Sequence, residues 1–236
     1  YVLILNNDTL VSPTMLSELV QVAEAYPEAG MVGPTMYCMD PPNTIFAAGS
    51  FIDWWRGIVW HRGMFQPASS CMHLKKPEPV DFIAGCCVLV SRRVIEVAGV
   101  LDPAYHLNYE DVEWSVRAQR HGFRPLYVPG AVMWHKVSAS LGKTSPSNSY
   151  YMTRNALLFF WKNSPPYLRW APVLQITLRT LRTVAAWSLK PHYWGQSFGR
   201  RRNASILGIR DFLLGRFGEM GSDVARVCYA LESYIR

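Results

Sequence analysis

The first nine residues constrain the fold more than any other part of this sequence. Tyr1–Leu5 is a continuous apolar run that ends in the polar residues 6–9, Asn-Asn-Asp-Thr. Such a run predicts a strand buried on both faces, as in a parallel sheet. Ser12 and Pro13 then have the order of a helix cap and a first helical residue, and Pro27 stops the pattern. A strand followed by a helix is the unit of an α/β fold, in which ligands bind beyond the carboxyl ends of strands.

The rest of the first half continues this alternation. Apolar segments predict strands over residues 31–37, 80–90 and 125–135. Capping signals predict helices over 92–98, between Ser91 and Gly99, and over 110–121. Residues 47–64 are expected to be irregular or antiparallel, and residues 66–79 to form a loop. The predicted fold class is α/β, a mixed sheet flanked by helices.

Composition divides the chain near a Ser/Gly/Pro loop at residues 138–149. Residues 1–148 carry 13 acidic and 11 basic side chains, whereas residues 149–236 carry 4 acidic and 13 basic ones among many aromatic and leucine residues. We expect a catalytic α/β domain over 1–148 and a helical, basic region over 149–236. Such a region either packs on the core with its charges in solvent or contacts an anionic membrane surface, and we favour the membrane.

Cysteine content and missing motifs narrow the class of protein. The five cysteines are odd in number and Cys86 adjoins Cys87, so a reducing compartment is expected. No signal peptide or run of about 20 apolar residues is visible, which predicts a cytoplasmic protein, peripheral at the inner face of the plasma membrane. Phosphate-loop, dinucleotide-binding, nucleophile-elbow and zinc motifs are missing. No nucleic-acid recognition motif accompanies the basic tail, so no nucleic acid is expected as partner.

Glu110 and Asp111 form an acidic pair at the predicted start of a helix. One explanation is that acids there complement the helix dipole, which contributes roughly 0.3–1 kcal/mol. The other is a general base, a carboxylate that takes the proton from a hydroxyl group as its oxygen attacks carbon. The pair taken alone leaves both explanations open.

Other polar residues follow predicted strands. Residues 6–8 supply amide and carboxylate oxygens that suit a divalent cation and a diphosphate, although Asn and Asp are also common in turns. His135 ends another predicted strand, where its imidazole would reach the same crevice as Asp8 and complete a metal site; a lone histidine is otherwise structural. Gly85 either lets the backbone approach a sugar closely or forms a bulge.

In order and spacing, these segments resemble the family-2 glycosyltransferases of the GT-A fold, especially the bacterial rhamnosyltransferase-like branch. The resemblance covers nearly the whole chain. It is carried by residues 5–9 (LNNDT), 81–85 (DFIAG), 88–93 (VLVSRR), 99–102 (GVLD), 109–114 (YEDVEW), 122–124 (GFR), 128–131 (VPGA), 134–136 (WHK) and 150–155 (YYMTRN).

The resemblance implies an inverting transfer from a nucleotide-diphosphate donor, a dTDP- or UDP-sugar, to a hydroxyl group of a glycan or lipid-linked acceptor. The pathway would be the synthesis of cell-surface polysaccharide or glycolipid. Asp111 would be the catalytic base, with Glu110 beside it. Asp8 and His135 would bind a divalent metal, Mn²⁺ or Mg²⁺.

The resemblance also implies a donor-binding set. Contacts to the donor and its diphosphate are expected from Asn6, Asn7, Asp8, Gly85 and Arg154. Asn6 stands where the family's Asp-x-Asp-like motif has its first acid, which weakens the predicted metal site.

In the family, the nucleotide's base and ribose are bound by strands that precede the Asp-x-Asp strand, with which this sequence begins. We therefore expect an amino-terminal nucleotide-binding portion to be lacking and the chain alone to bind donor weakly. The alternative is a non-catalytic fragment or pseudoenzyme that acts as a membrane- or partner-binding module. Asn6 favours this alternative, whereas Asp111 and His135 together disfavour it.

Overall fold

The computed structural model describes residues 1–136 and 145–229 and divides into two compact units. The first unit comprises Tyr1–Ile52, Val59–Leu101 and Glu110–Ala139. The second comprises Asp53–Ile58, Asp102–Tyr109 and Ser140–Arg236. Two short inner segments, 53–58 and 102–109, thus belong with the carboxyl-terminal helices. The boundary expected between residues 148 and 149 stays a prediction, and the loop on which it rests falls largely outside the described residues.

The first unit is built on a mixed sheet, as predicted. Its described strands run in the order β1-β8-β3-β9-β2, with β4 paired to β3 and β7 paired to β9. The β3–β9 pair is parallel and the other pairs are antiparallel. The strands are β1 (Val2–Leu5), β2 (Thr9–Val11), β3 (Met31–Cys38), β4 (Ile45–Ala47), β7 (Glu78–Pro79), β8 (Cys87–Val90) and β9 (Pro125–His135). A separate hairpin joins β5 (Ser50–Asp53) to β6 (Ile58–His61), and a short 3-10 helix, η1, spans Ala68–Cys71.

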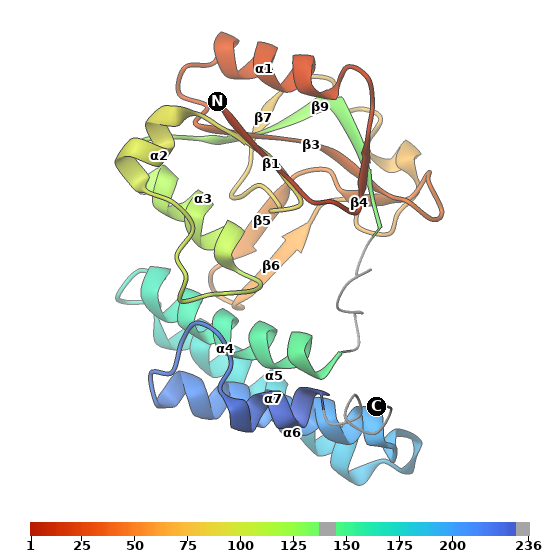
Figure 1. Cartoon of the computed structure of the whole chain (residues 1–236), viewed down its shortest axis with the longest axis vertical. Coiled ribbons are helices and arrows are strands. Elements are labelled where there is room, and N and C mark those ends of the chain that lie inside the picture. Colours follow the sequence, from red (N-terminus) through yellow and green to blue (C-terminus); the bar gives the residue numbers. More distant parts are fainter. Residues whose placement is uncertain (137–144, 230–236) are drawn as a thin grey trace. The chain divides into compact units, whose positions relative to one another are not determined.

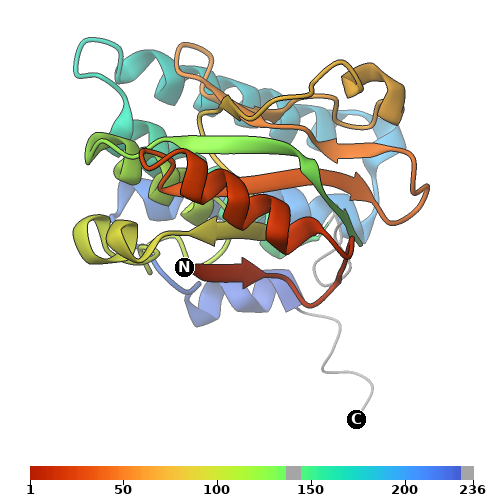
Figure 2. The same ribbon diagram turned by 90° about the horizontal axis from the view of Figure 1, so that it is seen from above.

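Helices cover both faces of this sheet. On one face, α1 (Met15–Ala25) buries Met15, Leu19 and Val22 in a core cluster with residues of β3, β8 and β9. On the other face, α2 (Arg92–Ala98) and α3 (Glu110–Arg120) bury Val94 and Trp114 against the same strands. Figure 1 shows the two helical layers, and Figure 2, which looks onto the α1 face, shows β1, β8, β3 and β9 side by side. The first unit is therefore a three-layer α/β/α structure, which confirms the predicted fold class.

Local signals located some elements and misplaced others. The Ser91 side chain accepts a hydrogen bond from the Val94 N–H, and Gly99 ends α2 with a positive φ of 76°, as the sequence predicts. By contrast, α1 begins at Met15 rather than at Pro13. The reason is that the Ser12 N–H donates to the Val132 carbonyl at 3.0 Å, which extends the pairing of β2 with β9 past Val11.

The prediction that the first strand is buried on both faces is wrong. Within the described residues β1 pairs with β8 alone, in antiparallel orientation, and lies at the end of the sheet order. Leu3 and Ile4 pack against the cores on opposite faces, while Val2 and Leu5 are exposed. Within β1, only Leu3 and Ile4 therefore pack against a core, one on each face of the sheet.

The second unit is helical. It contains α4 (Pro146–Asn163), α5 (Trp170–Leu189), the 3-10 helix η2 (Pro191–Tyr193), α6 (Gln196–Leu213) and α7 (Ser222–Tyr229). Its core includes Tyr150 and Tyr151 of α4, Ala204 of α6, and Val224 and Cys228 of α7. None of the described helices is long and apolar enough to cross a membrane.

Candidate active site

The carboxylate of Asp111 is fixed at the first turn of α3. Its Oδ2 accepts a hydrogen bond from the Gly85 N–H at 2.8 Å, and its Oδ1 accepts one from the Val112 N–H at 2.8 Å. A Cβ atom at Gly85 would lie 3.2 Å from the Asp111 Cβ, so the absence of a side chain permits this close approach. The structure therefore joins two of the predicted site residues directly.

Burial raises the pKa of both carboxyl groups of the acidic pair. The pKa of Glu110 rises from 4.5 to about 7, first because burial penalises its charged form and second because the Asp111 charge is close. Burial also raises the pKa of Asp111, while its hydrogen bonds from Gly85 and Val112 act in the opposite direction. Glu110 Oε2 is buried and has no hydrogen-bond partner in the described part of the chain. The two backbone N–H groups stabilise the Asp111 carboxylate, whereas Glu110 titrates near neutral pH, with a pKa of about 7.

A small cavity adjoins the pair. Its volume is about 40 Å³, and apart from Glu110 and Asp111 it is lined by Gly85 and apolar side chains that include Ile4, Ile83 and Trp114. This apolar lining is the physical source of the desolvation that raises both pKa values.

The chain reaches Glu110 through a strained turn. His106, Asn108 and Tyr109 all have positive φ values, of 57°, 64° and 71°. Each such conformation in a residue other than glycine costs about 1–3 kcal/mol and persists only where the surroundings hold it. Asn155 provides that hold, because its buried Nδ2 donates to the carbonyls of Tyr105, Leu107 and Asn108 at 2.6, 2.7 and 2.9 Å. No role is predicted for Asn155 from the sequence, although it lies in the segment 150–155 that carries the family resemblance.

Arg154 is buried, and its predicted role in donor binding stays a prediction. Its side chain is entirely buried in the second unit, where Nε donates to Asn155 Oδ1 and Nη1 to the Tyr150 hydroxyl. Its guanidinium also lies over the Tyr150 and Tyr151 rings, at 5.1 and 5.0 Å from their centroids. These contacts tie Arg154 into the packing of α4.

Asp8 and His135 come together, as their positions at strand ends predict. Thr9 of β2 pairs with His135 of β9, and the Lys136 N–H donates to the Asp8 carbonyl at 2.9 Å. His135 Nε2 consequently lies 3.3 Å from Asp8 Oδ1. Burial lowers the pKa of His135, and the Asp8 charge offsets part of this effect, which favours the neutral imidazole that binds metals.

This pair is suited to a metal that is shared with a substrate. Asp8 Oδ1 is buried with His135 Nε2 as its polar neighbour, and His135 Nδ1 is buried without a hydrogen-bond partner among the described residues. No group of three or more His, Cys, Asp or Glu side chains suited to a metal occurs in residues 1–136 and 145–229. Mg²⁺ and similar ions are commonly held by one or two protein ligands together with substrate phosphates and water. The residues therefore fit a divalent cation that a diphosphate completes.

The dipeptide Gly85–Cys86 connects Asp111 to the segment Asn6–Asp8 through backbone hydrogen bonds. The Gly85 N–H binds Asp111, while the Cys86 carbonyl accepts a hydrogen bond from the Asn6 N–H at 3.0 Å. The side chains of Asn6 and Asn7 are exposed beside this junction and remain candidates for donor binding. Cys86 itself is buried, and burial raises the pKa of its thiol, which agrees with a packing role.

The three-layer fold brings Asp8 and His135 together at the strand ends and holds Asp111 on α3. Together with a match to a family model, this arrangement indicates a sugar transferase. Residues 1–155 match the family model described as "Glycosyltransferase like family 2". The chain belongs to glycosyltransferase family 2.

Relatives of known function match over parts of the chain. An N-acetylglucosaminyl-diphospho-decaprenol L-rhamnosyltransferase of Mycobacterium tuberculosis is 27% identical over 195 residues, 76% of this chain and 62% of that protein. The dTDP-rhamnosyl transferase RfbF of Shigella flexneri is 32% identical over 88 residues, 34% of this chain and 30% of that protein. A solved mannosyltransferase of Pyrobaculum calidifontis, in complex with GDP-Man and Mn²⁺, has a TM-score of 0.44 and 13% identity, covering 91% of this chain and 62% of that one. This chain thus spans less than two thirds of the length of the mycobacterial relative.

Proposed function

We propose that this protein is an inverting, metal-dependent glycosyltransferase that moves a sugar from a nucleotide-diphosphate donor to a hydroxyl group of a lipid-linked acceptor. The observation that carries the proposal is the Asp111 carboxylate, which the Gly85 and Val112 N–H groups hold in one orientation beside an apolar cavity. A carboxylate fixed in this way is pre-organised to accept a proton.

In this mechanism Asp111 takes the proton of the acceptor hydroxyl as that oxygen attacks the anomeric carbon from the face opposite the leaving diphosphate. One displacement of this kind inverts the anomer. Asp8 and His135 would hold Mn²⁺ or Mg²⁺, which supplies positive charge toward the negative charge of the departing diphosphate. Below its pKa of about 7, Glu110 is neutral and places no second negative charge beside Asp111.

The names of the relatives support particular substrates. The mycobacterial relative is named for an acceptor in which a sugar is joined to decaprenol through a diphosphate, and the Shigella relative for a dTDP-sugar donor. We propose the same classes here: a dTDP- or UDP-sugar as donor and a polyprenyl-diphosphate-linked sugar as acceptor, used in the synthesis of a cell-surface polysaccharide or glycolipid.

An acceptor of this kind resides in a membrane, and α5 offers a surface that suits one. Trp170, Leu174, Leu178 and Leu181 recur on one face of α5 and are exposed. The tail from residue 149 carries 13 basic and 4 acidic side chains. An exposed apolar stripe within a basic region favours the interface of an anionic membrane, so we propose a peripheral location on the cytoplasmic face. Flotation with anionic and with neutral liposomes tests this, and equal binding to both would contradict it.

The transferase proposal is tested with Asp111→Asn. The chain, and any longer gene product that contains it, is incubated with dTDP- and UDP-sugars and a polyprenyl-diphosphate-linked acceptor. We expect transfer by the variant to fall by about 10²- to 10⁴-fold, the usual contribution of a general base. Asp53→Asn, which changes an acid that contacts Arg56 in the other unit, is the matched control and should leave the rate unchanged. Equal rates for D111N and the parent would remove Asp111 from the base role.

The non-catalytic alternative keeps one specific observation in its favour, which is Asn6 in place of the first acid of the metal motif. In that case the protein would serve as a membrane- or partner-binding module. Liposome binding without donor turnover, in a gene product that includes any upstream sequence, would favour this alternative.

A further inference from the structure

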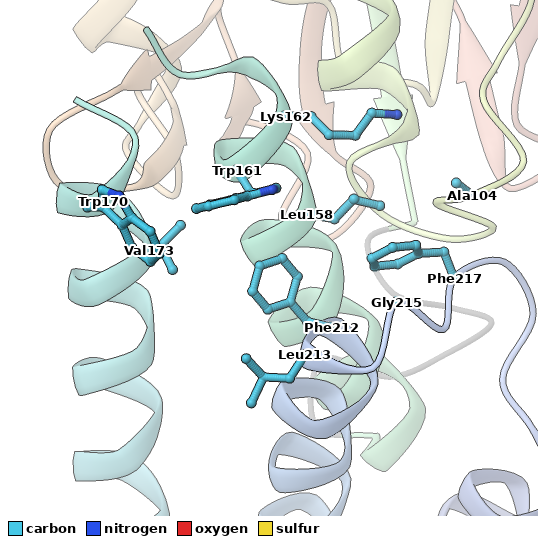
Figure 3. Close-up of a pocket in the computed structure, with 10 residues that line it drawn as sticks. All are labelled: Ala104, Leu158, Trp161, Lys162, Trp170, Val173, Phe212, Leu213, Gly215 and Phe217. Atoms are coloured by element: carbon cyan, nitrogen blue, oxygen red, sulfur yellow. The ribbon is translucent and has the colours of Figure 1, made fainter. Parts of the chain in front are cut away.

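The second unit contains an open apolar cavity of about 600 Å³, within the usual size range of small-molecule sites. As Figure 3 shows, Leu158 and Trp161 project from α4, Trp170 and Val173 from α5, and Phe212 and Leu213 from the end of α6. Lys162 is the one charged residue in the lining. A polar metabolite would lose its hydration here with little hydrogen bonding in return, so the lining favours a hydrocarbon.

One cation lines this cavity, and a second stacks on one of its lining residues. The Lys162 ammonium is half-exposed, and its Nζ lies 3.1 Å from Asp102 Oδ2. The Arg169 guanidinium lies over the Trp161 ring at 5.2 Å from its centroid, and its buried Nε has no hydrogen-bond partner within the described part of the chain. Lys162 lines the cavity, and its half-exposed ammonium can donate a charge-assisted hydrogen bond to an anionic oxygen. The charge pattern therefore suits a ligand with a hydrocarbon body and a phosphate at one end.

The cavity also continues into the exposed stripe of α5. Trp170 lines the cavity and is 70% exposed, and Leu174 follows it one turn later on the same helix face. A hydrocarbon chain could therefore pass between the stripe and the cavity without crossing a polar surface.

We infer that this cavity binds the polyisoprenoid chain of a polyprenyl-diphosphate-linked acceptor, with the diphosphate against Lys162. The inference rests on the proposed function for the identity of the acceptor. It adds a lipid-binding site in the second unit, lined by Ala104 and by residues between 158 and 217, whereas the candidate catalytic groups lie in the first unit.

The test measures binding without any transfer reaction. Geranylgeranyl diphosphate is titrated into the chain by calorimetry, below its critical micelle concentration, beside inorganic diphosphate and a straight-chain alkyl phosphate. Leu213→Asp places a charge in the cavity lining. Leu189→Asp is its matched control, because Leu213 and Leu189 lie on tail helices with similar exposed fractions, 74% and 75%. Of these two leucines, only Leu213 lines the cavity. At such exposed positions neither substitution should disturb folding.

We expect the parent protein to bind one geranylgeranyl diphosphate per polypeptide chain. The affinity should be at least about tenfold weaker in L213D, because the hydrocarbon would desolvate the new carboxylate. The affinity of L189D should equal that of the parent. Equal affinity in both variants, or no binding at all, would overturn the inference. Equal binding of inorganic diphosphate would reduce the site to the Lys162 ammonium, and equal binding of the alkyl phosphate would overturn the assignment to an isoprenoid. A dimer that L213D dissociates would show that a second copy of the chain covers the cavity instead.

The two proposals can fail separately. D111N should lower transfer by about 10²- to 10⁴-fold and keep geranylgeranyl diphosphate binding, whereas L213D should bind this lipid at least about tenfold more weakly. If no transfer is detected while binding follows this pattern, the lipid-binding site is supported and the transferase function is refuted. If transfer occurs and L213D binds the lipid like the parent, the transferase function is supported and this lipid-binding site is refuted.

Discussion

Glu110→Gln should make folding stability less dependent on pH. Between pH 4.5 and about 7 an unfolded chain has released the Glu110 proton, whereas the folded chain keeps it. Because the folded state then binds more protons, its stability falls as pH rises through this window and levels off above it. Glutamine has a similar shape and carries no charge, so the variant avoids this loss.

The magnitude follows from the pKa difference. Each pKa unit corresponds to about 1.36 kcal/mol, so a rise from 4.5 to about 7 corresponds to at most about 3 kcal/mol at pH 8. The measured value should be smaller, since Glu110 retains some solvent contact and shares its titration with Asp111. Relative to the parent, E110Q should gain roughly 1–3 kcal/mol between pH 4.5 and pH 8.

Guanidinium titrations at several pH values, followed by circular dichroism, measure this difference. Glu96→Gln is the control, because Glu96 is exposed and pairs with Arg92 at 2.7 Å on the surface of α2. Such a pair contributes only about 0.2–1 kcal/mol. A difference between E110Q and the parent that stays constant from pH 4.5 to pH 8 would refute the argument that Glu110 retains its proton in the folded state.

Three further substitutions test the site. Gly85→Ala should lower kcat by about 10- to 100-fold with little change in donor KM, because the new Cβ would displace Asp111; unchanged kcat would contradict this. Asn155→Ala should lower the free energy of unfolding by about 1–3 kcal/mol in denaturant titrations, since buried carbonyls lose their donor; a loss below about 0.5 kcal/mol would contradict it. His135→Ala should weaken Mn²⁺ binding in the presence of a nucleoside diphosphate by at least about tenfold, measured by calorimetry, and equal affinity would remove His135 from the metal site.

The sequence predicted the elements whose signals are local. Ser91 and Gly99 delimit α2, and β9 covers the predicted residues 125–135. The prediction over 80–90 was less successful, because only Cys87–Val90 form strand β8. Phe82, Ile83 and Ala84 are apolar and buried through packing without belonging to a strand, and an apolar run alone does not distinguish these two kinds of burial.

The candidate site was predictable to the extent that it lies at element ends. Asp8 and His135 each follow or end a strand, and strand ends meet at a sheet edge, so their proximity could be expected. The contact between Gly85 and Asp111 needs a fold that joins residues 26 positions apart, and the sequence contains no signal for it. The complete burial of Arg154 could not be predicted, because an arginine is rarely buried completely and no sequence signature marks its partners, Asn155 Oδ1 and the Tyr150 hydroxyl and ring.

The interleaving of the two units bears on how this protein can be divided. Residues 53–58 and 102–109 leave the sheet unit and pack with the carboxyl-terminal helices, where Trp54 stacks on Phe159 and Asn155 binds the turn before Glu110. A truncation at residue 148 would expose Trp54 and release a strained turn that leads directly to the acidic pair. The tail is therefore not a removable accessory, and exchange of tails between relatives should succeed only when these two inner segments are exchanged with them.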